Sequence, residues 1–82
     1  MTQPLHDKRI LAHFIVHQGH SYTLSLAEAY LDADNLWCVR ITPYQGETHS
    51  TVFIDGTLSI TDADGNYFTD HSAEPPVFWS EK

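Results

Sequence analysis

The sequence predicts an all-β fold, a small antiparallel meander of about five to seven strands that forms a sandwich or a partial barrel. Apolar and polar residues alternate with period two over residues 22–26, and Asp-Gly steps interrupt the apolar alternation of residues 51–68. In addition, no segment has the amphipathic pattern of a long helix. The 82 residues fit one small domain, 1–82, whose ends at 1–8 and 80–82 are expected to be flexible.

The period-two pattern extends over residues 22–43 if a turn at residues 32–35 sets Leu31 opposite Leu36. This pairing gives the hairpin one apolar and one more polar face, as burial of a single side requires. The apolar face carries Leu24, Leu26, Tyr30, Trp37, Val39 and Ile41, and the other carries Ser25, Ala27, Ala29, Cys38, Arg40 and Thr42. Because Ala, Glu and Leu are also good helix formers, a short helix over 26–33 is the alternative.

The second half of the chain contains the steps Asp55–Gly56 and Asp64–Gly65. Asp-Gly suits the positive φ angles of type I′ turns, so residues 51–68 predict strand, tight turn, strand, tight turn, strand. The stretches "LDADNLW" and "ITDADGNYF" indicate one type of turn used twice. Residues 62, 64 and 66 have the spacing of ligands in an EF-hand calcium loop. However, Tyr67 and Ala73 stand at the positions where an EF-hand needs glycine and a bidentate acid. These departures favour a hairpin turn.

The stretch "AHFIVHQGH", residues 12–20, contains three histidines and raises the question of a metal site. In a helix over 5–18, His13 and His17 would stand one turn apart, a common spacing for zinc ligands. The apolar residues of this segment point around most of such a helix, which leaves no polar stripe. In a strand the two histidines lie roughly 13 Å apart, too far to share one metal ion. The strand is the favoured interpretation.

His17 and His20 remain as weak metal candidates, on either side of Gln18–Gly19. A two-residue turn would set these two histidines directly opposite each other. A register slipped by one residue, which pairs Val16 with Tyr22, gives the better apolar core and is the predicted register. No cofactor is expected, and a transition-metal site at His17 and His20 is an alternative function.

Four basic and eleven acidic residues give the chain a formal net charge of −7. This charge disfavours nucleic acids and anionic membranes as partners. The single cysteine, Cys38, excludes an intramolecular disulfide and a cysteine-rich zinc site, and is expected to be a packed thiol. The N-terminal residues are polar, and no apolar run approaches the ~20 residues of a membrane span. We therefore expect a cytoplasmic protein.

No spacing singles out catalytic residues, and no glycine-rich stretch forms a phosphate-binding loop. Two features favour contact with other proteins. One is an unpaired sheet edge; the other is "EPPVFW", residues 74–79, where two prolines would present Val77, Phe78 and Trp79 as an exposed apolar segment. The alternative is that Phe78 and Trp79 cover the protein's own core. The predicted function is a small acidic protein-interaction or self-associating module, such as a homodimer, without catalysis.

Overall fold

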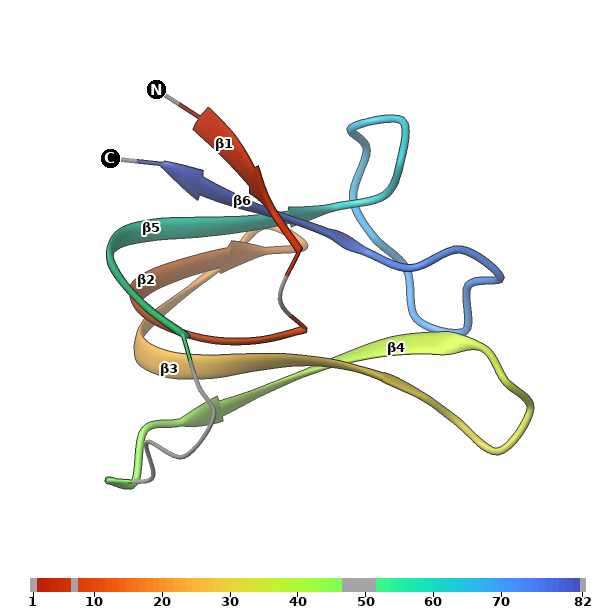
Figure 1. Ribbon diagram of the computed structural model, residues 1–82, viewed down its shortest axis with the longest axis horizontal. Coiled ribbons are helices and arrows are strands. Elements are labelled where there is room, and N and C mark those ends of the chain that lie inside the picture. Colours follow the sequence, from red (N-terminus) through yellow and green to blue (C-terminus); the bar gives the residue numbers. More distant parts are fainter. Residues whose placement is uncertain (1, 7, 47–51, 82) are drawn as a thin grey trace.

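The structure, a computed structural model, describes residues 2–6, 8–46 and 52–81 and contains six strands in one sheet (Figure 1). The strands are β1 (Thr2–Leu5), β2 (Arg9–His17), β3 (His20–Leu31), β4 (Trp37–Pro43), β5 (Val52–Thr61) and β6 (Val77–Glu81). The all-β class is confirmed, and strands occupy most of the described residues of 5–18 and 26–33, where helices were considered. The described residues include no helix that is long and apolar enough to cross a lipid bilayer.

The strand order is β1-β6-β5-β2-β3-β4, and every pair is antiparallel except β2 and β5, which run parallel. The prediction of a purely antiparallel meander is therefore wrong for this one pair. Parallel neighbours usually need a long crossover connection. Here β4 and β5 are staggered along the sheet. β4 pairs with residues 25–31 of β3. β5 lies along the part of β2 that pairs with residues 21–27 of β3. The start of β5 therefore lies near the level of the sheet at which β4 ends.

The step Asp55–Gly56 lies inside β5, so the tight turn predicted there is wrong. The register between β2 and β5 shifts between Ala12 and Phe14, which leaves Asp55 and Gly56 opposite His13 alone. An extra residue of this kind is a β-bulge, which bends the strand that carries it. In Figure 1, β5 bends sharply along its first half, and the whole sheet curls without closing.

The histidines at the facing ends of β2 and β3 are paired across a two-residue turn. Gln18 and Gly19 both have positive φ, 52° and 79°. A type I′ turn needs this conformation at both central residues, and the glycine makes it accessible at the second one. The predicted slipped register is therefore wrong, because Ile15 rather than Val16 pairs with Tyr22.

The hairpin of β3 and β4 is shifted by one residue from the predicted register, because Leu31 pairs with Trp37 rather than with Leu36. The turn is a loop of three residues, closed by the Asp32 N–H, which donates to the Leu36 carbonyl at 2.9 Å. Asn35, at its end, has a φ of 61°. A type I turn followed by a left-handed residue is a common three-residue hairpin loop. The predicted turn between these two strands is confirmed, but the predicted length of its loop is wrong.

The one-residue shift exchanges the two faces of β3. On β4 the residues predicted to face the core do so, because Val39 is buried and Trp37 and Ile41 pack against the core. On β3 the predicted faces are wrong: Leu24 and Tyr30 are exposed. The small residues are buried instead, namely Ser25, Ala27 and Ala29.

Large rings from the C-terminal part of the chain explain why small residues face inward. Phe68, in the segment between β5 and β6, and Phe78, in β6, are among the largest fully buried side chains. Both belong to the same core cluster as Ala27 and Ala29. Because protein interiors are close-packed, the alanines leave the volume that the two rings fill.

Residues 62–76 connect β5 to β6 and cover part of the outer edge of β4 (Figure 1). The Trp37 N–H donates to the Ser72 carbonyl at 2.7 Å, and the Trp37 carbonyl accepts the His71 N–H at 2.9 Å. The Ser72 N–H also donates to the Trp37 carbonyl, at 3.1 Å, and these three backbone hydrogen bonds fix the segment beside the first residue of β4.

The two ends of the chain lie side by side, because β1 pairs with β6 (Figure 1). The end segments 1–8 and 80–82 contribute Thr2–Leu5 to β1 and residues 80 and 81 to β6. Their flexibility stays a prediction.

Candidate functional site

The predicted contact residues Val77, Phe78 and Trp79 begin β6, which lies between β1 and β5. Phe78 is 2% exposed and belongs to the core cluster. Trp79 is partly buried, and its indole N–H donates to the Thr61 hydroxyl at 2.8 Å. The placement of Phe78 corresponds to the alternative in which this segment covers the protein's own core. A contact role for Val77 and Trp79 stays a prediction.

The metal candidates His17 and His20 stand opposite each other at the ends of β2 and β3. His17 is buried, and its Nδ1 has no hydrogen-bond partner among the described residues. Burial lowers the pKa of His17, His20 lowers it further, and Asp70 acts in the opposite direction. Within the described part of the chain, neither histidine belongs to a group of three ligand-type side chains close enough to share a metal. A metal site at this pair stays a prediction.

An open groove of about 760 Å³ follows β5, where the consecutive residues 53–57 line it. Apolar side chains from β1, β2 and β5 form much of its wall: Leu5, Phe14, Phe53 and Ile54. Phe14 and Phe53 are 51% and 50% exposed, and the His13 ring lies 5.5 Å from the Phe53 ring. Neighbouring large apolar side chains that stay exposed mark a surface suited to binding.

The same stretch of β5 has an open backbone edge. β6 pairs with residues 57–61 of β5, and β2 pairs along the opposite edge. Of the strands that the structure describes, none pairs with residues 52–56 on the β6 side. Unpaired N–H and C=O groups on such an edge are a template for an added strand.

The described wall of the groove is acidic. Asp55 and Glu81 line it, and its described lining residues include no lysine or arginine. The Asp55 carboxylate is exposed, and His13 Nε2 lies 3.3 Å from it. A ligand that carries positive charge therefore fits this groove better than an acidic one.

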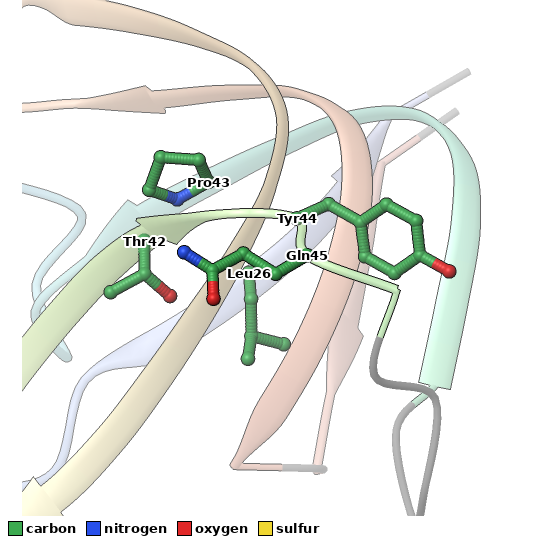
Figure 2. A pocket seen from close by; sticks show the side chains of 5 residues that line it. All are labelled: Leu26, Thr42, Pro43, Tyr44 and Gln45. Carbon is green, nitrogen blue, oxygen red and sulfur yellow. The ribbon is translucent and has the colours of Figure 1, made fainter.

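A second hollow, of about 170 Å³, lies where β4 ends (Figure 2). Its wall combines Leu26 of β3 with residues 42–45 at the end of β4.

Two loops of the same form occur in the molecule, at residues 32–36 and 62–66. In each, the first aspartate, Asp32 or Asp62, accepts two backbone N–H groups through Oδ1, from the residues two and four positions ahead, at 2.8 to 3.0 Å. In each, the fourth residue has a positive φ, 61° at Asn35 and 86° at Gly65. The prediction of one turn type used twice is confirmed. The Asp62 carboxylate is occupied by this turn, which agrees with the hairpin interpretation of residues 62–70.

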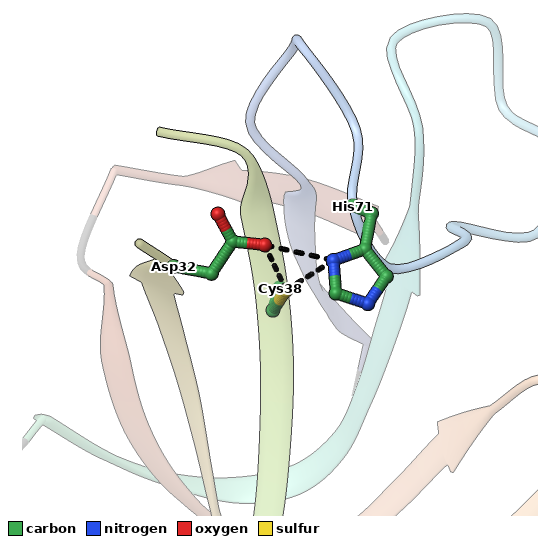
Figure 3. Close-up of side chains that lie close together, drawn as sticks. All are labelled: Asp32, Cys38 and His71. Carbon is green, nitrogen blue, oxygen red and sulfur yellow. Dashed lines mark hydrogen bonds and ion pairs between the residues drawn. The ribbon is translucent and has the colours of Figure 1, made fainter. Parts of the chain in front are cut away.

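The first loop has two ligand-type neighbours (Figure 3). Asp32 Oδ2 lies 2.7 Å from His71 Nδ1 and 3.8 Å from Cys38 Sγ, and Sγ lies 3.7 Å from Nδ1. The Leu36 N–H and then the His71 ring lower the pKa of the Asp32 carboxyl. Cys38 is 3% exposed, whereas the His71 side chain is mostly exposed. Figure 3 shows the three side chains pointing toward one another from the loop, from β4 and from the segment before β6.

This arrangement excludes a nucleophile–base–acid triad in the described geometry. A triad needs the nucleophile and the carboxylate on different ring nitrogens of the histidine. Here Nδ1 of His71 faces both Cys38 and Asp32. Three converging donor atoms, a sulfur, a nitrogen and an oxygen, instead form a set that can hold a metal ion.

Part of this cluster has a signal in the sequence. Asp32 and Cys38 stand on either side of one predicted turn, so a correct hairpin register brings them together. His71 is 39 residues from Asp32, and no local pattern predicts its arrival. Spacing in the sequence pairs only histidines that are neighbours in the chain, and the approach of His71 to Cys38 depends on the fold.

Comparisons of this chain with models of protein families, with curated proteins and with solved structures find no match.

Proposed function

We propose that this protein is a protein-binding module without catalytic activity, which accepts an extended segment of a partner as an additional strand along β5. One observation carries the proposal: residues 53–56 line a groove and also have an edge that no described strand pairs with. In strand addition, backbone hydrogen bonds supply affinity, and pockets for alternate side chains supply specificity. β5 offers both along the same residues.

The side chains of the groove favour a partner strand with large apolar residues. Phe14 and Phe53 are exposed aromatic rings, and aromatic residues are enriched among those that carry binding energy at protein interfaces. Leu5 and Ile54 extend the apolar wall. An added strand would therefore place apolar side chains against this wall and its other side chains toward solvent.

The charge of the groove favours basic residues in the partner segment. Asp55 and Glu81 line the groove, and the whole chain carries a formal net charge of −7. A second copy of the chain would bring the same negative charge, which disfavours self-association. The single cysteine agrees with a reducing compartment, so we place this module in the cytoplasm.

Selection from a random peptide library displayed on phage, with the folded protein as bait, tests the proposal. We expect selected peptides to alternate apolar residues with lysine or arginine. Backbone amide NMR signals of residues 52–57 and of Ser80 and Glu81 should shift when a selected peptide binds. Peptides without basic residues, or shifts confined to other parts of the protein, would contradict the proposal.

Two variants and a matched control sharpen the test. Asp55→Lys should weaken binding of a basic peptide at least tenfold, about 1.4 kcal/mol, because it reverses a charge in the groove wall. Phe53→Ser should weaken binding to a similar extent through lost apolar contact. Asp64→Lys makes the same charge change in an exposed turn outside the groove and should change binding less than about twofold. If light scattering shows a dimer that forms through residues 52–56, the occupant is a second copy and the basic partner is excluded.

A further inference from the structure

We infer that Asp32, Cys38 and His71 form a binding site for a zinc ion, with one coordination position left for water or an external ligand. The site is independent of the groove proposed above. It joins three parts of the chain: the loop after β3, the second residue of β4, and the segment that covers the edge of β4. No other group of three ligand-type residues in the described part of the chain lies within the same distances.

The distances between the donor atoms fit tetrahedral coordination after a small adjustment. Zinc bonds of about 2.0 to 2.3 Å at tetrahedral angles separate neighbouring ligand atoms by about 3.4 to 3.6 Å. Cys38 Sγ already lies 3.7 Å from Nδ1 and 3.8 Å from Oδ2. The hydrogen-bonded pair of Oδ2 and Nδ1, 2.7 Å apart, has to open by about 0.7 Å to accept the ion. The exposed His71 ring can move by this amount.

The loop orients the Asp32 carboxylate toward the site. Oδ1 accepts the N–H groups of Asp34 and Leu36, so Oδ2 is left for His71 and Cys38. In metal sites, groups outside the coordination sphere typically orient the ligands by hydrogen bonds of this kind. The carboxylate is therefore set to bind through one oxygen.

The backbone holds His71 in place without help from a metal. Its N–H donates to the Trp37 carbonyl at 2.9 Å, and the Val39 N–H donates to the Asp70 carboxylate at 3.0 Å. These bonds join His71 and its neighbour Asp70 to the residues on both sides of Cys38. His71 also has a φ of 66°, an unfavourable conformation for a residue other than glycine, and such residues cluster at functional sites.

The chemistry of the donor set selects the ion. Thiolate and imidazole ligands favour zinc and its transition-metal neighbours, whereas magnesium and calcium prefer oxygen ligands alone. Three protein ligands with an open fourth position are typical of zinc sites that bind a water molecule or a small ligand. Because the thiol must lose its proton to the solvent when the metal binds, affinity should rise with pH.

Isothermal titration of the reduced protein with Zn²⁺ tests the site. We expect one ion per chain, and loss of at least about a hundredfold in affinity in Cys38→Ser and in His71→Ala, since even residues outside the coordination sphere cost 10- to 100-fold. Asp62→Asn changes the equivalent aspartate of the second loop and should leave the affinity within about twofold. Co²⁺ should give a thiolate-to-cobalt charge-transfer band in the wild-type protein, and Cys38→Ser should lack it.

Three outcomes would overturn the inference: no saturable binding, binding that persists in both Cys38→Ser and His71→Ala, or binding that His20→Ala abolishes. The last result would move the site to His17 and His20. NMR spectra of each variant establish that it is folded. If Cys38→Ser does not fold, His71→Ala decides the question, because the His71 side chain is mostly exposed and its loss leaves the core intact.

Discussion

The loops at residues 32–36 and 62–66 share one backbone conformation but have different surroundings. Both begin with an aspartate that caps two N–H groups, and both have a left-handed residue in the fourth position. Six residues after the first aspartate, the first loop has Cys38 and the second has Phe68. The thiol lies beside the Asp32 carboxylate and the His71 ring, whereas the phenyl ring is buried in the core.

This difference shows which features of the loops depend on local sequence and which depend on the rest of the fold. The turn itself follows from an aspartate in the first position and from asparagine or glycine in the fourth, which are local preferences. The role of the residue six positions after the aspartate depends on which segment covers it. Residues 70–72 cover Cys38, and the curled sheet covers Phe68. The same turn therefore precedes a cluster of polar side chains in one place and core packing in the other.

The largest effect should come from Phe68, six positions after the first aspartate of the second loop. Phe68→Ala should lower the free energy of unfolding by about 3 to 5 kcal/mol, because it removes a fully buried ring and leaves a cavity. Cys38→Ala should cost clearly less in the reduced, metal-free protein, because the thiol is smaller and does not belong to the core cluster. Urea denaturation of both variants measures the difference. Equal losses would contradict the division of roles between the two loops.

The first residue of each loop should give the next largest effect. Asp62→Ala removes the acceptor of two backbone N–H groups and should lower the free energy of unfolding by about 1 kcal/mol. Asp32→Ala should lower it further, because this variant also removes the partner of His71. Thermal unfolding at pH 7 with a chelator present compares them. If Asp62→Ala is the more damaging change, the contact with His71 does not stabilise the fold.

A pH titration should isolate the Asp32 carboxyl. Its pKa is lowered in the folded protein, first by the Leu36 N–H and then by His71. A carboxyl of this kind stabilises the fold above its unfolded pKa of about 3.9, and the contribution is lost as the pH falls through the folded pKa. The wild-type melting temperature should therefore fall below about pH 4. Asp32→Asn should flatten this decrease, and an unchanged slope would show that the lowered pKa does not contribute.

The sequence predicts the class of the fold and the two loops because both depend on short-range patterns. Period-two alternation and Asp-rich turns indicate strands and hairpins without any knowledge of distant contacts. The faces of β3 do not follow from such short-range patterns. Leu24 and Tyr30 look like core residues, but rings from residues 68 and 78 occupy the inner volume and leave space only for alanines. No local pattern carries that information.

Register and the candidate metal site depend on details that alternation does not resolve. A shift of one residue in either hairpin exchanges its faces, and the choice depends on the φ angles of Gln18 and Asn35. Asp55 and Gly56 are residue types typical of a tight turn, but here they form a bulge. β2 pairs with β5 on both sides of this step. His71 lies beside Cys38 and belongs to the long connection between β5 and β6, in which Phe68 is buried in the core.

The fourth position of the loops should give the smallest effect. Asn35 and Gly65 both occupy the left-handed region, which asparagine and glycine tolerate better than other residues. Asn35→Gly and Gly65→Asn should therefore each change the free energy of unfolding by less than about 0.5 kcal/mol. Gly65→Ala should cost about 1 kcal/mol, although a Cβ at this position meets no atom within 4 Å, because alanine resists the positive φ. If urea denaturation shows Gly65→Asn to be as costly as Gly65→Ala, asparagine and glycine are not equivalent there, and the two loops differ in more than their surroundings.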